Sequence, residues 1–324
     1  MARDELRRGN LVEVKDPAAI LATLDERGAL EGLPFMPEMA RLCGRRFLVD
    51  RRADRVCDTV HYSGSRKPPR SVLLADLRCD GSAHGGCQAE CRFIWKEAWL
   101  REVAPDSPAS APVDARDLAD LVARTAAHVR HRIAVNGHSE ERWWCQATEL
   151  PNASTHLRLW DPRSYLRECA TGNVPPARFV RVLARASVQE PMRKLGLIPE
   201  VHLPGTGGAP GPEARLDLQP GELVQVKTKE EIAATLTPEG RNRGMWFDRE
   251  MMPFCGGVFR VRQRIRRFID ERAGGRMIEF KNSDCVTLEG VVCSGERSLR
   301  RWFCPRAIYP YWRECWLRRV EPGA

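Results

Sequence analysis

Two long stretches of this chain repeat each other. Residues 9–58 read GNLVEVKDPAAILATLDERGALEGLPFMPEMARLCGRRFLVDRRADRVCD, and residues 221–270 read GELVQVKTKEEIAATLTPEGRNRGMWFDREMMPFCGGVFRVRQRIRRFID. They align without a gap at an offset of 212 residues, and 21 of the 50 aligned positions are identical. A self-match of this length indicates that one folding unit occurs twice in the chain.

The repeat resumes after a loop of unequal length. Residues 74–81 align with residues 288–295, and residues 95–100 align with residues 312–317. We therefore expect a first β unit at 8–105, a connector with linkers at 106–211 and a second β unit at 212–324. The total of 324 residues is enough for two or three such domains.

The hydrophobic pattern predicts different structure in the repeats and in the connector. Residues 11–14 alternate apolar and polar, and residues 47–49 read as another strand, with glycine turns between such segments. Short strands of this kind favour a small β-barrel or roll. In the connector, Asp114 can cap a helix that carries His128 and His131 on one face, and residues 177–195 predict a second helix. The expected fold class is α+β, with two β units joined by a mainly helical connector.

Both repeats share the pattern G-x-x-V-x-V … F-x-x-E-M-x-x-x-C-G-x-x-F-x-V. This order resembles SH3-like barrels of the mind-bomb and KOW kind over the fifty aligned residues of each half. The resemblance implies a fold and no activity. The chain as a whole also resembles a family of uncharacterised actinobacterial and cyanobacterial proteins, which implies a bacterial protein and no particular function.

The charge balance leaves nucleic acid open as a partner. The net charge is +9 and the pI is about 9.1, which suits a polyanion as well as it suits an ordinary arginine-rich protein. The densest basic run is RVRQRIRR, where Val261 and Ile265 also fit the inward face of a plain strand. The candidate nucleic-acid contacts in and beside this run are Arg260, Arg262, Arg264, Arg266 and Arg267.

The first residues, MARDELRRGNLVEV, contain no apolar core of a secretory signal, and no run approaches the length of a membrane span. We expect a cytoplasmic protein without a membrane partner. Its twelve cysteines should then be reduced, and close clusters of cysteine favour metal over disulfide.

The densest cluster is CDGSAHGGCQAEC, residues 79–91, which gives C-x4-H-x2-C-x3-C. Its four donors, Cys79, His84, Cys87 and Cys91, suit one tetrahedral zinc ion at about 2.0–2.3 Å, and thiolates also hold iron or iron–sulfur clusters. The start of the loop resembles the CDGSH iron–sulfur motif, although Ala83 is inserted before the histidine and no C-x-C precedes it. That resemblance implies cysteine and histidine ligands to a cluster.

Three cysteine positions recur in both halves. Cys43, Cys79 and Cys87 of the first repeat align with Cys255, Cys293 and Cys304 of the second. Cys43 is therefore a reserve ligand, and the three partners are candidates for a second-half site. The alternatives are that these cysteines are small buried hydrophobic residues, their usual role, or that some form a disulfide.

Two glutamates recur between tryptophans in W-x-E-x-W-L. Glu97 and Glu314 could have a raised pKa and act as acid or base, or could simply pair with an arginine of the same unit. Glu38 and Glu250 recur as well, with the same two interpretations, and the stretch from Trp143 to Gln146 could line a pocket. Common nucleotide-binding and hydrolase motifs are absent from the sequence.

Three functions follow from these observations. The first is a metalloprotein with a Cys/His site in a duplicated β scaffold, with room for a metal-dependent enzyme of bacterial specialised metabolism that binds a small molecule in a cleft between the repeats. The alternatives are a nucleic-acid-binding or regulatory protein and a protein-interaction scaffold. The sequence does not decide whether the protein is an enzyme, and it leaves the oligomeric state open.

Overall fold

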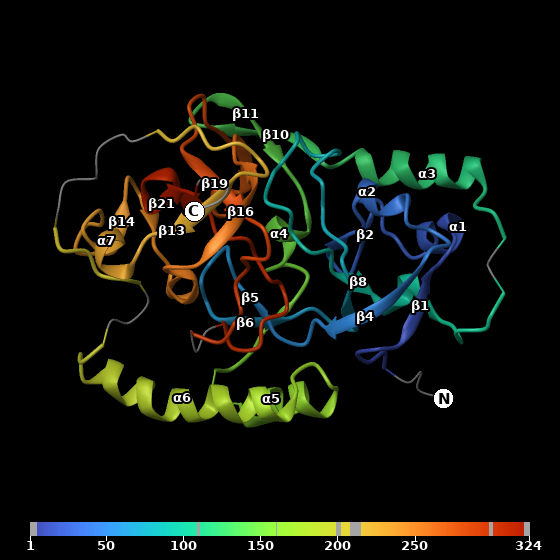
Figure 1. Ribbon diagram of the computed structural model, residues 1–324. Coiled ribbons are helices and arrows are strands. Elements are labelled where there is room, and N and C mark those ends of the chain that lie inside the picture. The colour runs from blue at the N-terminus through green and yellow to red at the C-terminus, as the bar shows by residue number, and fades with distance from the viewer. Residues whose placement is uncertain are drawn as a thin grey trace. The chain divides into compact units, whose positions relative to one another are not determined.

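The structure is a computed structural model that describes residues 5–108, 111–159, 161–198, 202–207, 215–297 and 301–320. The chain divides into two compact units (Figure 1). The first contains the residues up to Pro176 together with 267–278 and 303–306, and the second contains 177–266, 279–302 and the residues from Ala307 onward. Parts of both predicted linkers, residues 109–110 and 208–211, lie outside the described residues.

A five-stranded antiparallel sheet forms the centre of the first repeat, with the strand order β8-β7-β4-β1-β9. The strands are β1 (Leu11–Val14), β4 (Arg46–Arg52), β7 (Ser71–Leu74), β8 (Trp95–Lys96) and β9 (Leu100–Glu102). The connections hold α1 (Pro17–Leu21), β2 (Ala29–Leu30), β3 (Leu33–Pro34), α2 (Pro37–Ala40), β5 (Val56–Cys57), β6 (Ser65–Lys67) and the 3₁₀ turn η1 (Glu97–Trp99). The predicted strands at residues 11–14 and 47–49 are confirmed within β1 and β4.

The second repeat contains a sheet with the equivalent order, β20-β19-β16-β13-β21. Its strands are β13 (Leu223–Val226), β16 (Val258–Arg264), β19 (Cys285–Leu288), β20 (Trp312–Arg313) and β21 (Leu317–Arg319). Its connections hold α7 (Lys229–Ala233), β14 (Arg241–Asn242), β15 (Met245–Trp246) and the 3₁₀ turns η2 (Arg249–Phe254) and η5 (Glu314–Trp316). A bulge interrupts β4 between Val49 and Arg51 and β16 between Val261 and Gln263. The shared order and bulge support the internal repeat.

Each repeat has its own aromatic core. Phe35 meets the rings of Trp95 and Trp99 edge-on in the first unit, with ring centroids 6.1 and 5.1 Å apart. Phe247 meets Trp312 and Trp316 in the same way in the second unit, at 5.8 and 5.2 Å. Because both tryptophans of W-x-E-x-W-L are fully buried, this motif anchors the last two strands of each sheet to the core.

The mixed helix-and-strand character that we predicted is confirmed. Within the described residues, however, both five-stranded sheets are open and no sheet closes into a barrel. The likeness to SH3-like barrels therefore stays a prediction. No helix among these residues is long and apolar enough to cross a membrane.

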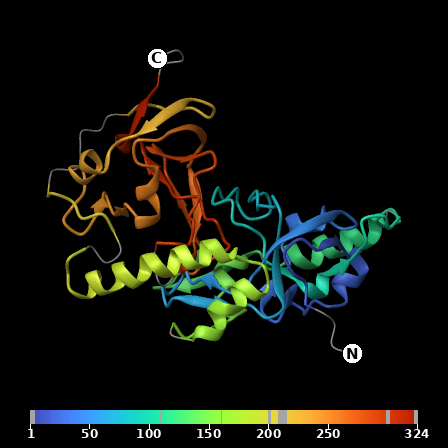
Figure 2. The same cartoon turned by 60° about the horizontal axis from the view of Figure 1, so that its bottom comes forward.

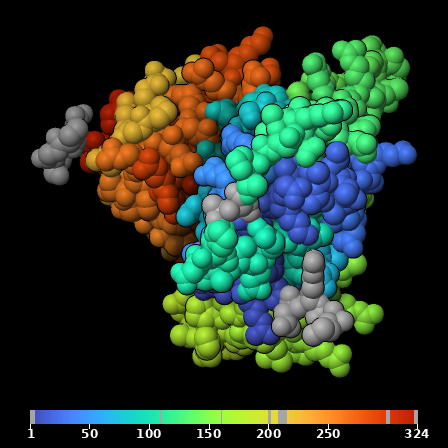
Figure 3. Space-filling view, turned by 90° about the vertical axis from the view of Figure 1, so that its right-hand side faces the viewer, coloured from blue at the N-terminus to red at the C-terminus, as the bar shows by residue number. Residues whose placement is uncertain are grey.

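The connector contains strands as well as helices. Asp114 caps α3 (Ala115–Ala126) as predicted, and α3 packs against α1 and α2 on the face shown in Figure 3. The hairpin of β10 (Arg130–Val135) and β11 (His138–Trp143) follows. Its turn, Asn136-Gly137, has positive φ at both residues. The Asn-Gly dipeptide favours this turn and is the strongest short hairpin signal in a sequence. The prediction that His131 shares a helix face with His128 is therefore wrong, because α3 ends at Ala126 and His131 lies on β10.

The rest of the connector begins with α4 (Gln146–Glu149), β12 (Thr155–His156) and α5 (Pro162–Ala170). The predicted helix at 177–195 is confirmed as α6 (Pro176–Lys194), the long yellow-green helix of Figures 1 and 2. The first unit is completed by β17 (Arg267–Asp270), the turn η3 (Glu271–Ala273) and β18 (Arg276–Glu279). The stretch before α6 thus belongs to the first unit and supplies part of its functional site.

Candidate metal centre

The loop between β7 and β8 folds back on itself around the CDGSAHGGCQAEC sequence. Its two ends are joined by a β-bridge between Arg78 and Arg92 and by a 2.8 Å hydrogen bond from the Cys79 amide to the Cys91 carbonyl. Gly81 has a φ of +71°, and a Cβ at this position would lie 2.2 Å from the Cys87 carbonyl oxygen. Only glycine therefore allows the two halves of the loop to approach so closely.

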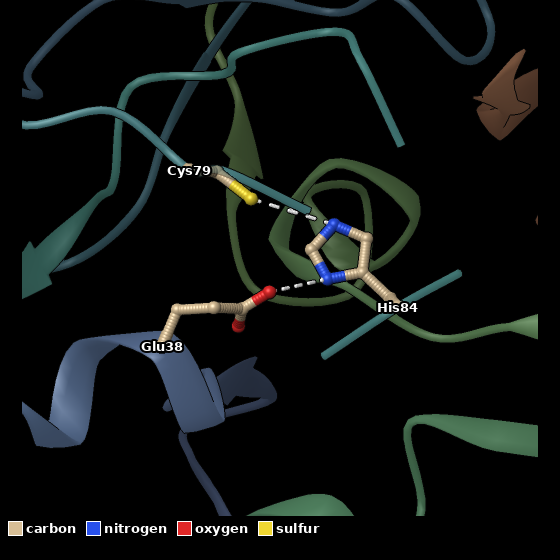
Figure 4. A group of neighbouring side chains, drawn as sticks. All are labelled: Glu38, Cys79 and His84. Atoms are coloured by element: carbon tan, nitrogen blue, oxygen red, sulfur yellow. Dashed lines mark hydrogen bonds and ion pairs between the residues drawn. The ribbon is translucent and has the colours of Figure 1, made fainter. Parts of the chain in front are cut away.

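The folded loop brings three ionisable side chains into a row (Figure 4). His84 lies between the other two: its Nε2 atom is 3.4 Å from the Cys79 Sγ, and its Nδ1 atom is 2.9 Å from the Glu38 Oε1. Glu38 comes from α2, and its Oε1 also accepts a 3.0 Å hydrogen bond from the Ala83 amide. Relative exposures of 5%, 8% and 3% for Glu38, Cys79 and His84 show that the row is buried.

More thiols surround the same histidine. Cys87 also approaches the His84 ring, and Cys79, Cys87, Cys91 and Cys145 all line one hollow of about 60 Å³. Backbone amides point at two of the sulfur atoms, Gly81 N at Cys79 (3.3 Å) and Ile269 N at Cys87 (3.4 Å). Amide donors of this kind favour the thiolate form, which is the form that binds metals.

The electrostatics of the row are those of a buried charged pair with thiols beside it. Burial works to raise the pKa of Glu38, but the contacts with His84 and the Ala83 amide outweigh it and hold this pKa below its ordinary value. Burial works to lower the pKa of His84, and its contacts with Cys79, Cys87 and Glu38 reverse that effect and raise it. Burial raises the pKa of Cys79, partly opposed by His84.

Charged residues also lie at another part of the hollow. Arg306 donates to the Cys57 carbonyl at 3.0 Å and to the Thr59 hydroxyl at 2.9 Å, and its Nη2 lies 3.8 Å from the Glu271 carboxylate. Both Arg306 and Glu271 line the hollow. Cys304 does not line the hollow, and its sulfur accepts a 3.2 Å hydrogen bond from the Cys57 amide.

The structure therefore separates the predicted ligands into two groups. Cys79, His84, Cys87 and Cys91 share the hollow of the first unit. Cys43 packs in the apolar core instead, where burial and Asp16 raise its pKa to about 12.

The second-half candidates are divided as well. Cys255 and Cys293 belong to the second unit, whereas Cys304 is part of the first. Glu38, Cys79 and His84 form the one metal-type cluster found among the described residues, and no second-half cysteine is part of it.

Glu97 and Glu314 serve as ion-pair partners in the buried sheet. Glu97 Oε1 lies 2.7 Å from Arg52 Nη1, and Glu314 Oε1 lies 2.8 Å from Arg264 Nη2. Each glutamate also accepts from backbone amides upstream of its sheet, Glu97 from Leu6 and Glu314 from residues 216–218. The matching partners favour the structural interpretation of these glutamates over acid–base chemistry.

The arginines of the basic run have different surroundings. Arg264 is committed to Glu314 and to backbone carbonyls, and the Arg267 guanidinium donates to the Gly85 carbonyl beside the cysteine loop. Val261 and Ile265 are fully buried, as a plain strand requires. The remaining residues of the run, Arg260, Arg262 and Arg266, are exposed; Arg260 donates to the Gly221 carbonyl, and Arg262 lies over the Tyr309 ring.

Two residues of the site were not among the predicted ligands. Glu38 stood out only because it recurs as Glu250, and Cys145 only as part of a stretch that could line a pocket. Cys145 and Gln146 do line the hollow. A carboxylate five residues before a Cys-Gly pair carries no metal signature, so the sequence pattern alone could not place Glu38 beside the histidine.

No protein-family model matches the chain, and comparisons with curated proteins and with solved structures give no match. The class of site is therefore defined by its own chemistry: a buried imidazole that is oriented by a carboxylate and faces several thiols. That set of donors suits a soft or borderline transition metal.

Proposed function

We propose that the first repeat is a metal-binding unit that holds one zinc ion through Cys79, His84 and Cys87, with Cys145 or Cys91 as the fourth ligand. The observation that carries the proposal is the His84 ring, whose Nδ1 lies 2.9 Å from the Glu38 carboxylate while its Nε2 lies 3.4 Å from the Cys79 sulfur. Metal-bound histidines usually donate their other ring N–H to a carboxylate, which sets the tautomer and the ring orientation.

The donor set favours zinc over harder ions. Thiolates and imidazole are the ligands of tetrahedral structural zinc sites, whereas calcium and magnesium select oxygen. Among the candidate donors of the described residues, only those of Cys79, His84 and Glu38 lie within 4.8 Å of one another. Cys87 and the fourth thiol would therefore have to close on the ion as it binds. Iron is the alternative for the same ligands.

Burial supports a structural role for this ion. Cys79, His84, Cys87 and Cys145 are all less than a tenth exposed, and four protein ligands leave no open position for a substrate. The ion would tie the loop at residues 79–91 to the start of α4 or, with Cys91, close the loop on itself. A cytoplasmic location is part of this proposal, because thiolate ligands persist in a reducing compartment.

The experiment is cobalt substitution of protein purified without oxygen. Tetrahedral Co²⁺ bound by thiolates absorbs in the visible and near-ultraviolet range, so the spectrum reports both ligand type and geometry. We expect Cys87→Ser and His84→Ala to weaken or abolish the sulfur-to-cobalt absorption. Cys169→Ser on α5 is the matched control, because Cys169 does not line the hollow. Unchanged spectra in both ligand variants would refute the assignment.

The row of Cys79, His84 and Glu38 also favours a second candidate, a thiol nucleophile. A nucleophile beside a base that is oriented by a third group is the arrangement of cysteine hydrolases. In that case metal-free protein should be alkylated by iodoacetamide at Cys79 faster than at Cys87, and His84→Ala should remove the difference. The deep burial of Cys79 supports the metal site more than it supports this alternative.

The other sequence-based hypotheses stay predictions. They are SH3-like units, a substrate bound between the repeats, nucleic-acid binding through the basic run and a scaffold function. Arg264 lends little support to nucleic-acid binding, since its guanidinium is already engaged by Glu314. A salt-dependent shift of DNA or RNA would test that hypothesis directly.

A further inference from the structure

In the second repeat, the glutamate that corresponds to Glu38 has different hydrogen-bond partners. Glu250 corresponds to Glu38, but Glu250 accepts hydrogen bonds from the Ser294 amide (3.1 Å), the Ser294 hydroxyl (2.7 Å) and the Arg297 amide (2.8 Å). Glu38 binds the loop after Cys79 through a histidine and an amide. The equivalent carboxylate in the second repeat thus holds the loop after Cys293 through a serine and backbone amides, and it fixes the loop that carries Glu296 and Arg297.

A separate hollow of about 280 Å³ opens beside this loop within the second unit. Its walls are strongly basic on one side and apolar on another. Arg181 and Arg185 from α6 and Arg297 from the loop supply the charge, and Pro253 and Phe254 supply the apolar surface. The hollow is thus large enough for a small organic ligand with one charged end.

Positive charge exceeds negative charge around the hollow. Arg178, Arg181 and Arg185 follow one face of α6, and all three converge on a single carboxylate, Glu296, at 2.7, 3.6 and 3.9 Å. Arg181, Arg185 and Arg297 are the three arginines of the described lining. The lining also contains two carboxylates, Glu250 and Glu296. Glu250 accepts hydrogen bonds from the loop, and Glu296 is the carboxylate that the arginines of α6 contact.

The guanidinium groups of the lining lie close enough to affect one another's pKa. Burial and the nearby Arg185 lower the pKa of Arg297. The three guanidinium groups of the described lining outnumber its two carboxylates, and this excess of positive charge favours an anionic ligand.

We propose that this hollow, lined by Arg181, Arg185, Arg297 and Ser294, binds a phosphomonoester whose organic group rests on Pro253 and Phe254. A phosphate dianion offers three acceptor oxygens, and the planar, forked guanidinium suits them better than an ammonium group does. Glu296 occupies the same arginines in the absence of ligand and competes with it. This site is independent of the metal proposed for the first repeat.

The test is titration calorimetry of the full-length protein with phenyl phosphate, and with inorganic phosphate as a probe that lacks the apolar group. We expect phenyl phosphate to bind more tightly than inorganic phosphate. The double variant Arg185→Gln/Arg297→Gln should bind roughly tenfold or more weakly, as expected for lost charge-assisted hydrogen bonds. Arg116→Gln, an exposed arginine on α3, is the control and should bind as the parent does.

A gain of binding separates a ligand site from a merely structural ion-pair cluster. Glu296→Gln should tighten phenyl phosphate binding by about twofold to fivefold, because it removes the carboxylate that competes for Arg181 and Arg185. A purely structural role for Glu296 predicts no tighter binding, and that result would overturn the proposal even if the arginine variants fail to fold. Binding of an oligonucleotide that phenyl phosphate does not displace would instead assign the arginines to a nucleic-acid backbone and would also overturn it.

Discussion

Replacement of Glu38 by glutamine isolates the charge of the carboxylate that orients His84. Glutamine keeps an oxygen that can accept from the Ala83 amide and from the ring N–H, so the loop has the same acceptor after the substitution. What is lost is the negative charge 2.9 Å from Nδ1. Loss of such a carboxylate typically weakens metal binding 10- to 100-fold, which corresponds to about 1.4–2.7 kcal/mol.

The assay is competition for Zn²⁺ between the protein and a chromophoric chelator under reducing conditions. The matched control is Glu250→Gln at the equivalent position of the second repeat, where the carboxylate binds a serine and backbone amides. We expect the loss of affinity in Glu38→Gln alone. An affinity within about twofold of the parent, or an equal loss in the control, would refute the orienting role assigned to Glu38.

Three further predictions concern the scaffold around the site. Burial raises the pKa of Glu168 to about 7 from an ordinary 4.5, so the free energy of unfolding should fall by about 3 kcal/mol as pH rises from about 4.5 to 7. Glu168→Gln should remove most of this pH dependence in urea unfolding measured at pH 5 and pH 8. An unchanged pH profile would contradict the prediction. Gly81→Ala should abolish metal binding because the added Cβ would meet the Cys87 carbonyl across the loop. The control Gly9→Ala, also at positive φ but with open space around it, should cost only about 1 kcal/mol of stability and leave the metal content intact. Equal metal content in both variants would show that metal binding does not need the close approach of the two halves of the loop. Glu97→Gln should lower the free energy of unfolding by about 1.5–3 kcal/mol, because it weakens a charge-assisted hydrogen bond to buried Arg52 while the Asp54 carboxylate stays 2.9 Å away. A chemical denaturation midpoint equal to that of the parent would show that Asp54 alone satisfies Arg52.

Much of the local structure could be predicted because local signals dominate it. The strand at Leu11–Val14 follows from alternation, the start of α3 follows from Asp114, and α6 matches its predicted range within one residue at each end. The hairpin at residues 130–143 was missed even though Asn136-Gly137 marks it, because helical spacing upstream was extended past the end of α3.

The candidate site was only partly accessible to sequence reasoning, for a physical reason. Cys79, His84 and Cys87 lie in one short loop, so their spacing reveals them. Glu38 reaches His84 from α2, and Cys145 lines the hollow from the start of α4, through packing contacts between segments far apart in the chain. Spacing within a loop carries no information about such partners.

The recurrence of cysteines was misleading for a related reason. Cys43 and Cys255 hold equivalent positions in the two repeats, and each packs with the hydrophobic core of its own repeat. A position can recur because it fills space beneath a sheet. Recurrence alone therefore does not distinguish a ligand from a small buried hydrophobic residue.

Metal content of the full-length protein, purified without oxygen and measured by elemental analysis, tests the central claim most directly. The account predicts about one zinc ion per chain, no visible colour, and loss of the metal in Cys79→Ser/Cys87→Ser but not in Cys43→Ser. Iron with visible charge-transfer bands would keep the ligands and change the metal. A folded parent protein without metal, or a double variant that retains its metal, would contradict the account.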